Sequence, residues 1–302
     1  MKITLADNGW TPIVSEIDLN TATKEEIDII GCLTGRQTLV VIKNQGHLTA
    51  QDDVVAVKRF GSPDINADYV KNVVIDGTER IMRRVTGKKN PDGKWSGIFG
   101  MKEELNWHAN PVEDPNRRPV VYLRAVTGSK GSVTSFTNHA RAWQNNISDT
   151  LKEFILNNDL HVMHAHDNTS TVVRETMEAL YDGSVNRQFL GNEANTPPLL
   201  HKNKFGAIGP FISWFQFDKF VELDKEKSQK ICQALKTEIM SDQHNFYDHH
   251  WEDGDLLLSD QWLGLHKRHA FEDIENRLLH RAVVDYNNID ETMVDKALDL
   301  IK

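Results

Sequence analysis

Apolar runs of strand length recur along this chain, far apart and unevenly spaced. Four of them are "TLVVIK" at 38–43, "PVVYLRAV" at 119–126, "GDLLLSD" at 254–260 and "RLLHRAVV" at 277–284. A doubly wound parallel sheet requires strands and crossover helices in steady alternation, and this spacing does not provide it. We therefore expect a mixed α+β fold, in which helices decorate an antiparallel sandwich or barrel.

Helix signals lie between these runs. The sequences T-x-x-E at 23–26 and T-x-x-D at 49–52 each precede an apolar stretch, as a capping box does. Residues 138–158 have a helical pattern, and residues 225–240 form an amphipathic helix pattern. No internal repeat accompanies them, so the helices are individual additions to the sheet.

Two stretches are rich in loop-forming residues. Residues 84–104 are rich in Gly and Lys, and residues 168–198 are polar and end in two adjacent prolines. Both are candidate lids or loop insertions, because binding loops are drawn from such segments. A chain of 302 residues can be one unit of this fold class, and we expect a single domain over 1–302.

Composition excludes several classes of protein. The net charge of −9 disfavours nonspecific binding to nucleic acid or to an anionic membrane. The start "MKITLADNGW" has no signal-peptide core and no apolar run is long enough for a membrane span, so we expect a cytoplasmic protein. Cys32 and Cys232 are far apart in helical patterns, so any metal would take nitrogen and oxygen ligands.

The segment "NWHAN" at 106–110 places a histidine two residues before an asparagine. Thirteen histidines make a structural role for any one of them the ordinary interpretation. The C-terminal part adds weight, because His266 is followed by Arg277 and Arg281, 11 and 15 residues later. Two arginines four apart on a strand share a face, and two fixed cations suit a dicarboxylate. The alternative is a surface ion pair with "FEDIEN".

Taken together, these segments resemble the taurine dioxygenase-like family of iron(II)/2-oxoglutarate-dependent oxygenases. The resemblance covers most of the chain, including "NWHAN", "GSVTSF" and "HHWEDGDLLLSD" through "RLLHRAVV". It implies a double-stranded β-helix, or jelly roll, as the core. It further implies that Fe(II), 2-oxoglutarate and O2 are the cofactors. His108, His266 and Asn110 would be the catalytic metal positions, and Thr134, Arg277 and Arg281 would bind the cosubstrate.

Asn110 departs from the family pattern, which has a carboxylate at this position. Asparagine can bind a metal weakly through its carbonyl oxygen or leave the position to water or another anion. Glu113 or Asp114 could supply the missing carboxylate only by turning back toward the metal, and Pro111 stiffens the chain between. Halogenase relatives have a small neutral residue here that admits chloride, so halogenation stays open beside hydroxylation. A non-catalytic sensor of 2-oxoglutarate or another anion is a third possibility.

The substrate is predicted only as a class. Arg281 permits a small acidic or zwitterionic metabolite, and Asn106, Tyr69 and Phe217 are further candidate contacts. The structural alternatives are a turn-stabilising role for Asn106 and a core position for Phe217. The pair His164 and His166 is interpreted as structural, and residues 248–250 as a solvated edge. The sequence leaves homo-oligomerisation open.

Overall fold

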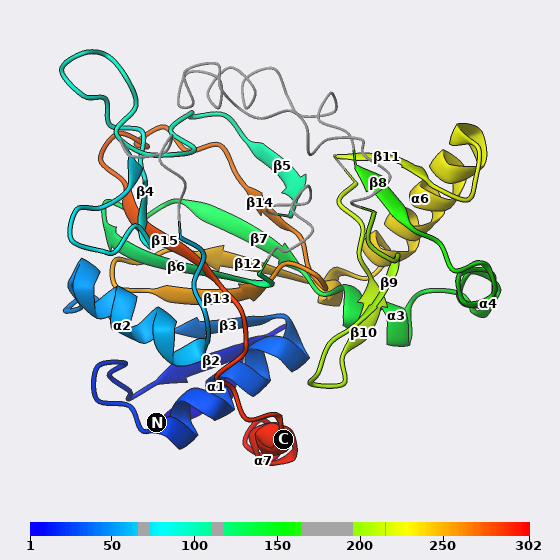
Figure 1. The fold of residues 1–302 in the computed structure, drawn as a ribbon, viewed down its shortest axis with the longest axis horizontal. Coiled ribbons are helices and arrows are strands. Elements are labelled where there is room, and N and C mark those ends of the chain that lie inside the picture. The colour runs from blue at the N-terminus through cyan, green and yellow to red at the C-terminus, as the bar shows by residue number, and fades with distance from the viewer. Residues whose placement is uncertain (66–72, 110–117, 165–195, 215) are drawn as a thin grey trace.

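Two β-sheets lie face to face at the centre of the molecule (Figure 1). The computed structural model describes residues 1–65, 73–109, 118–164, 196–214 and 216–302. The larger sheet has seven strands, in the spatial order β1 (Lys2–Leu5), β2 (Pro12–Ser15), β3 (Leu39–Ile42), β13 (Leu256–Asp260), β6 (Val120–Thr127), β15 (Leu278–Val284) and β4 (Arg83–Val85). The smaller sheet has the order β12 (Phe246–His250), β7 (Val133–Thr137), β14 (His266–Arg268) and β5 (Leu105–His108). The pairings are antiparallel except between β2 and β3.

Both faces of the larger sheet are covered, and alternate side chains of its strands pack on the two sides. On β13, Leu256 and Leu258 pack in an apolar cluster with the helices, whereas Leu257 packs between the sheets with Phe136 and Trp251. Successive side chains of a strand point to opposite faces, so a strand covered on both sides is apolar throughout. The four runs predicted from the sequence are confirmed as β3, β6, β13 and β15.

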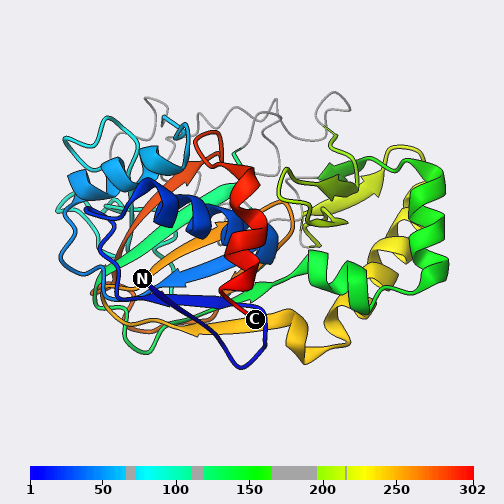
Figure 2. The same ribbon diagram turned by 90° about the horizontal axis from the view of Figure 1, so that it is seen from below.

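Helices cover the outer face of the larger sheet (Figures 1 and 2). These are α1 (Lys24–Gln37), α2 (Ala50–Phe60) and the C-terminal α7 (Val294–Asp299), which follows the 3-10 turn η6 (Glu291–Met293). Both predicted capping boxes are present, because Thr23 and Thr49 each accept from the backbone of the third helical residue, whose carboxylate bonds back.

A smaller unit lies beside the sandwich and has an apolar core of its own (Figure 1). Its elements are α3 (His139–Asn145), α4 (Asp149–Asn158), β8 (Val162–His164), β9 (Leu200–Lys202), β10 (Ile208–Pro210), β11 (Phe217–Phe220), α6 (Lys225–Met240) and the 3-10 turn η5 (Gln243–Asn245). The helix predicted at 225–240 is confirmed. The pattern at 138–158 forms two helices, because buried Ile147 interrupts it and Ser148 begins the second.

The mixed α+β fold expected from the sequence is confirmed. Among the described helices, none is both long and apolar enough to span a membrane. Cys32 and Cys232 are buried as free thiols in α1 and α6.

Candidate active site

Two histidines predicted as metal ligands meet across neighbouring strands. His108, the last residue of β5, is directly opposite His266, the first residue of β14, and their ring centroids are 4.2 Å apart. Nδ1 of His108 lies 2.6 Å from the carbonyl oxygen of Asn106. A carbonyl can only accept, so Nδ1 carries the proton and Nε2 keeps its lone pair. Such a backbone partner is what orients a metal-binding imidazole.

Burial and neighbouring cations keep both rings neutral. Burial lowers the pKa of His108 to about 4 against the opposing effect of the Asn106 carbonyl, and the charges of Arg281 and Arg268 add to the decrease. Burial also holds the pKa of His266 well below its usual value, with contributions from His108 and Arg281. A metal ligand must be a neutral imidazole, and this environment supplies two of them.

The third predicted metal position, Asn110, lies outside the described residues. Within the described ranges, no group of three His, Cys, Asp or Glu side chains could hold a metal ion. The two histidines fit two positions of an Fe(II) ion, for which imidazole is a suitable donor. Residue 110, a solvent molecule or a bound ligand would therefore have to complete the coordination of the iron.

Thr134 and Arg277 come together around one indole ring. Trp251 Nε1 donates to Thr134 Oγ1 at 2.9 Å, and the Arg277 guanidinium carbon lies 5.7 Å from the centre of the Trp251 ring. Arg277 is only 3% exposed, and its guanidinium makes no hydrogen bond or ion pair with the described residues. Burial lowers the pKa of its guanidinium to about 9, and Arg268 adds to this decrease. A buried cation without an anion is costly, so this position suits an anionic ligand.

Arg281 and Arg268 supply two more buried positive charges. Arg281 is on β15, opposite Leu123 of β6, and its charge reaches both histidines. Arg277 and Arg281 are both buried, but the prediction that they share one face of a strand is wrong, because Arg277 precedes β15 and a register shift lies between Leu278 and Leu279. Arg268 was not predicted as a site residue, because "HKRHAF" has the composition of a solvated loop. Its charge acts on both His108 and Arg277, so it lies within electrostatic reach of the two ends of the site.

Arg268 also fixes the loop that leads into β5. Its guanidinium donates to the carbonyl oxygens of Phe99, Met101 and Glu103 at 2.5–2.6 Å. This loop is the end of the candidate lid at 84–104, whose other part folds back on itself through bridges such as Lys89 with Trp95. The second candidate lid falls mainly in 165–195, outside the described residues.

Of the remaining predicted substrate contacts, Asn106 and Phe217 lie in the described residues, in different parts of the fold. Asn106 is exposed on β5, and its side-chain oxygen accepts from the Trp107 backbone at 2.8 Å. Phe217 is 2% exposed and packs against Phe220 in the core of the smaller unit, so the structure does not bring it to the histidine pair. Tyr69 lies outside the described residues. His164 is buried and accepts from the Ser213 backbone, a structural contact of the kind expected; His166 lies outside the described residues.

The predicted solvated edge at 248–250 is correct for two of its three residues. Asp248 and His250 are exposed on the edge strand β12, but His249 is 2% exposed and pairs with Asp255 at 3.1 Å. The alternation of a strand places His249 on the inner face, where its ring meets Trp251 edge to face at 4.7 Å between centroids.

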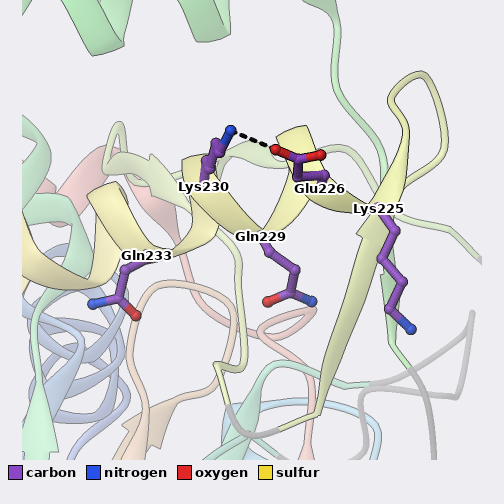
Figure 3. Close-up of a pocket in the computed structure, with 5 residues that line it drawn as sticks. All are labelled: Lys225, Glu226, Gln229, Lys230 and Gln233. Atoms are coloured by element: carbon purple, nitrogen blue, oxygen red, sulfur yellow. Dashed lines mark hydrogen bonds and ion pairs between the residues drawn. The ribbon is translucent and has the colours of Figure 1, made fainter.

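A hollow along α6 has no connection with these residues (Figure 3). It is lined by polar side chains of one helix face, among them Lys230 and Glu226, which form an ion pair at 2.6 Å. Pairs of this kind, four residues apart on an exposed helix, are ordinary surface features.

The sequence model of the taurine catabolism dioxygenase TauD, TfdA family matches residues 6–283. The chain belongs to this family. The TauD, TfdA family assignment confirms the resemblance seen in the sequence. Its members are dioxygenases that use Fe(II), 2-oxoglutarate and O2, and the neutral histidine pair and the unpaired arginine fit these requirements.

Curated relatives are distant. The chain is 25% identical over 274 residues to a pentalenolactone F synthase of Streptomyces avermitilis, with 82% of each chain covered. It is also 25% identical over 202 residues to a pentalenolactone F synthase of Streptomyces arenae, covering 64% of this chain and 65% of the relative.

Solved structures share the fold. AAD-2, in complex with Mn(II) and N-oxalylglycine, matches with a TM-score of 0.70 and 17% identity, covering 94% of this chain and 98% of the other. A taurine dioxygenase from Burkholderia xenovorans matches with a TM-score of 0.68 and 18% identity, covering 94% and 90%. At these identities the likeness shows the fold and leaves the substrate open.

Proposed function

We propose that this protein is a single-domain oxygenase that hydroxylates an unactivated C–H bond of a small, anionic or zwitterionic metabolite. One observation carries the proposal: a neutral pair of opposed histidines lies within the influence of Arg281 and Arg268, while Arg277 is buried without an anion in the described chain. The two facing sheets support a double-stranded β-helix as the core of this domain.

The side chains divide into two groups. His108 and His266 would hold the iron, with Asn110 at the third protein position, and the bound iron with 2-oxoglutarate and O2 supplies the oxidising chemistry. Arg277 would bind the distal carboxylate of 2-oxoglutarate, because a guanidinium forms two parallel hydrogen bonds with a carboxylate. The Thr134 hydroxyl would donate a hydrogen bond to the same carboxylate. The buried environment of these groups excludes water and strengthens each contact.

The substrate contacts follow from the remaining polar residues. Arg281 supports an anionic group on the substrate or the metal end of the cosubstrate, because its charge reaches both histidines. Asn106 is exposed beside His108 and keeps its amide N–H groups as donors. Tyr69 and Phe217 stay predictions from the sequence, and the core position of Phe217 favours a supporting role for it. The relatives named as pentalenolactone F synthases support a small-molecule substrate.

Anaerobic addition of Fe(II) and 2-oxoglutarate to the apoprotein tests this proposal. We expect a visible metal-to-ligand charge-transfer band that requires both additions. No band at saturating iron would contradict an iron-chelated cosubstrate and favour the alternative of an anion sensor. A screen for metabolites consumed only when iron, 2-oxoglutarate and O2 are all present would then identify the substrate.

A second candidate function rests on Asn110. A neutral residue at this position removes the charge that a carboxylate would provide, as in a halogenase, but keeps nearly the same volume. Wild type incubated with chloride and its substrate would then give a chlorinated product, and Asn110→Asp would divert the reaction to hydroxylation. In a hydroxylase, Asn110→Asp should tighten Fe(II) binding, because it restores a negative charge beside a dication. Unaltered iron affinity would remove Asn110 from the site.

A further inference from the structure

Trp251 lies between two residues that the proposed function assigns to the cosubstrate. It directly follows β12, is 1% exposed, and its backbone N–H donates to the Ser132 carbonyl at 3.1 Å. Its ring is held edge to face by His249, whose partner Asp255 is paired in turn with Lys43. The indole is therefore fixed from its own backbone and from the edge strand.

The indole N–H sets the direction of the Thr134 hydroxyl. An indole nitrogen can only donate, so Thr134 Oγ1 must accept in the 2.9 Å bond. The hydroxyl has one proton, and this bond leaves it available to a second acceptor. Thr134 is 4% exposed and makes no other side-chain hydrogen bond in the described part of the chain, so that acceptor would be a ligand oxygen.

The face of the same ring supports Arg277. A guanidinium carbon 5.7 Å from the ring centre is within range of a cation–π interaction, which is stronger when the cation is desolvated. No carboxylate of the described residues competes for this cation. The ring thus limits where the guanidinium can lie, but it does not neutralise the positive charge.

We propose that Trp251 is a positioning residue for 2-oxoglutarate, which aligns the Thr134 hydroxyl and the Arg277 guanidinium on one carboxylate without contacting it. The inference rests on the proposed function of these two residues. In this role the indole N–H and the Thr134 hydroxyl are coupled, because the N–H orients the hydroxyl toward the carboxylate. A tryptophan that only fills the core would support the fold but would have no such coupling.

A double-mutant cycle on cosubstrate affinity tests this coupling. Isothermal titration of 2-oxoglutarate into Mn(II)-loaded enzyme measures binding without turnover. Trp251→Phe keeps a ring under Arg277 but removes the N–H, and we expect about 5- to 10-fold weaker binding, as for the loss of one hydrogen bond. Thr134→Val should weaken binding by a similar factor. The double variant should be no more than about 2-fold weaker than Thr134→Val alone, because the N–H has then lost its partner.

Trp10→Phe is the matched control. Trp10 is also buried between the sheets, and its Nε1 donates to the His244 carbonyl at 2.7 Å. This variant should lose stability without a change in cosubstrate affinity. If Trp251→Phe binds 2-oxoglutarate as wild type does, or if its effect multiplies with that of Thr134→Val, the inference is wrong while the proposed function stands. If wild type itself gives no binding heat, the proposed function fails, and the inference with it.

Discussion

Two buried arginines, Arg124 on β6 and Arg277 just before the neighbouring strand β15, have opposite environments. Arg124 on β6 is 1% exposed and faces the helices, where Asp53 of α2 accepts from its Nε and Nη2 at 2.6 and 2.7 Å. Tyr122 and His280 also bond to this carboxylate. Burial alone would lower the pKa of Arg124, but the bonds and charge of Asp53 outweigh it and raise this pKa above its usual value.

Arg277, next to β15, has no such partner in the described chain, and burial lowers its pKa to about 9. We propose that this difference separates a charge that stabilises the fold from one that binds a ligand. A bidentate carboxylate makes Arg124 part of the protein's own structure. An unpaired guanidinium beside a hydroxyl and an indole is a site that an anion completes.

The largest expected effect follows from breaking the paired arginine. Asp53→Asn leaves Arg124 buried without an anion, and removal of one partner of a buried pair costs about 3–5 kcal/mol. Urea unfolding should show this loss. Tyr122→Phe, which removes one neutral donor to the same carboxylate, should cost only about 1 kcal/mol. Equal small losses in both variants would mean that the pair does not stabilise the helix layer.

A change in stability of intermediate size is expected at Asp260, a buried carboxyl whose hydrogen-bond donors are neutral. Asp260 accepts from the backbones of Trp262 and Leu263 and from the Tyr286 hydroxyl, and burial raises its pKa to about 6. Because this folded-state pKa exceeds the usual 3.8, ionisation is harder in the folded state, and stability falls as the pH rises from about 4 to about 6.

Asp260→Asn cannot titrate, so its stability deficit relative to wild type should narrow by about 2 kcal/mol between pH 4 and pH 7. Urea midpoints measured in parallel across this range would show the narrowing. A deficit that stays constant with pH would assign the titration to other groups.

The smallest expected effect on stability concerns the unpaired arginine. Arg277→Met removes a buried charge that no described carboxylate neutralises, so the apoprotein should stay within about 1 kcal/mol of wild type. Arg124→Met is the contrasting variant, because it leaves Asp53 buried without its cation. Thermal unfolding of the two apoproteins measures the difference, and a large loss in Arg277→Met would show that the guanidinium has a structural partner.

Local signals allowed much of the fold to be predicted. Capping boxes at Thr23 and Thr49 depend on residues within one turn, and strand alternation depends on neighbours in sequence. The aromatic-rich segment at 207–217 was less informative, because it forms the short strand β10 and then an irregular connection that reaches the first residue of β11. Short aromatic-rich segments do not reveal which of several cores they enter, which is why Phe217 was predicted as a possible contact.

The site was predictable where the family pattern marks a residue. His108 lies opposite His266, and Thr134 and Arg277 both contact Trp251, but their roles stay predictions. The histidine pair depends on the register between β5 and β14, and register is set by distant parts of the chain. The roles of Arg268, Trp251 and His249 were missed, because their sequence context resembles surface or core. Asn110 lies outside the described residues and stays a prediction.

Isothermal titration of 2-oxoglutarate into Mn(II)-loaded protein tests most directly our proposal that Arg277 binds the cosubstrate. Arg277→Met should weaken binding about 10- to 150-fold, the equivalent of about 1.5–3 kcal/mol for a hydrogen-bonded charge. Arg36→Met, which removes one charge from the end of α1, is the control and should leave the affinity unchanged. Cosubstrate affinity within 2-fold of wild type in Arg277→Met would contradict the claim.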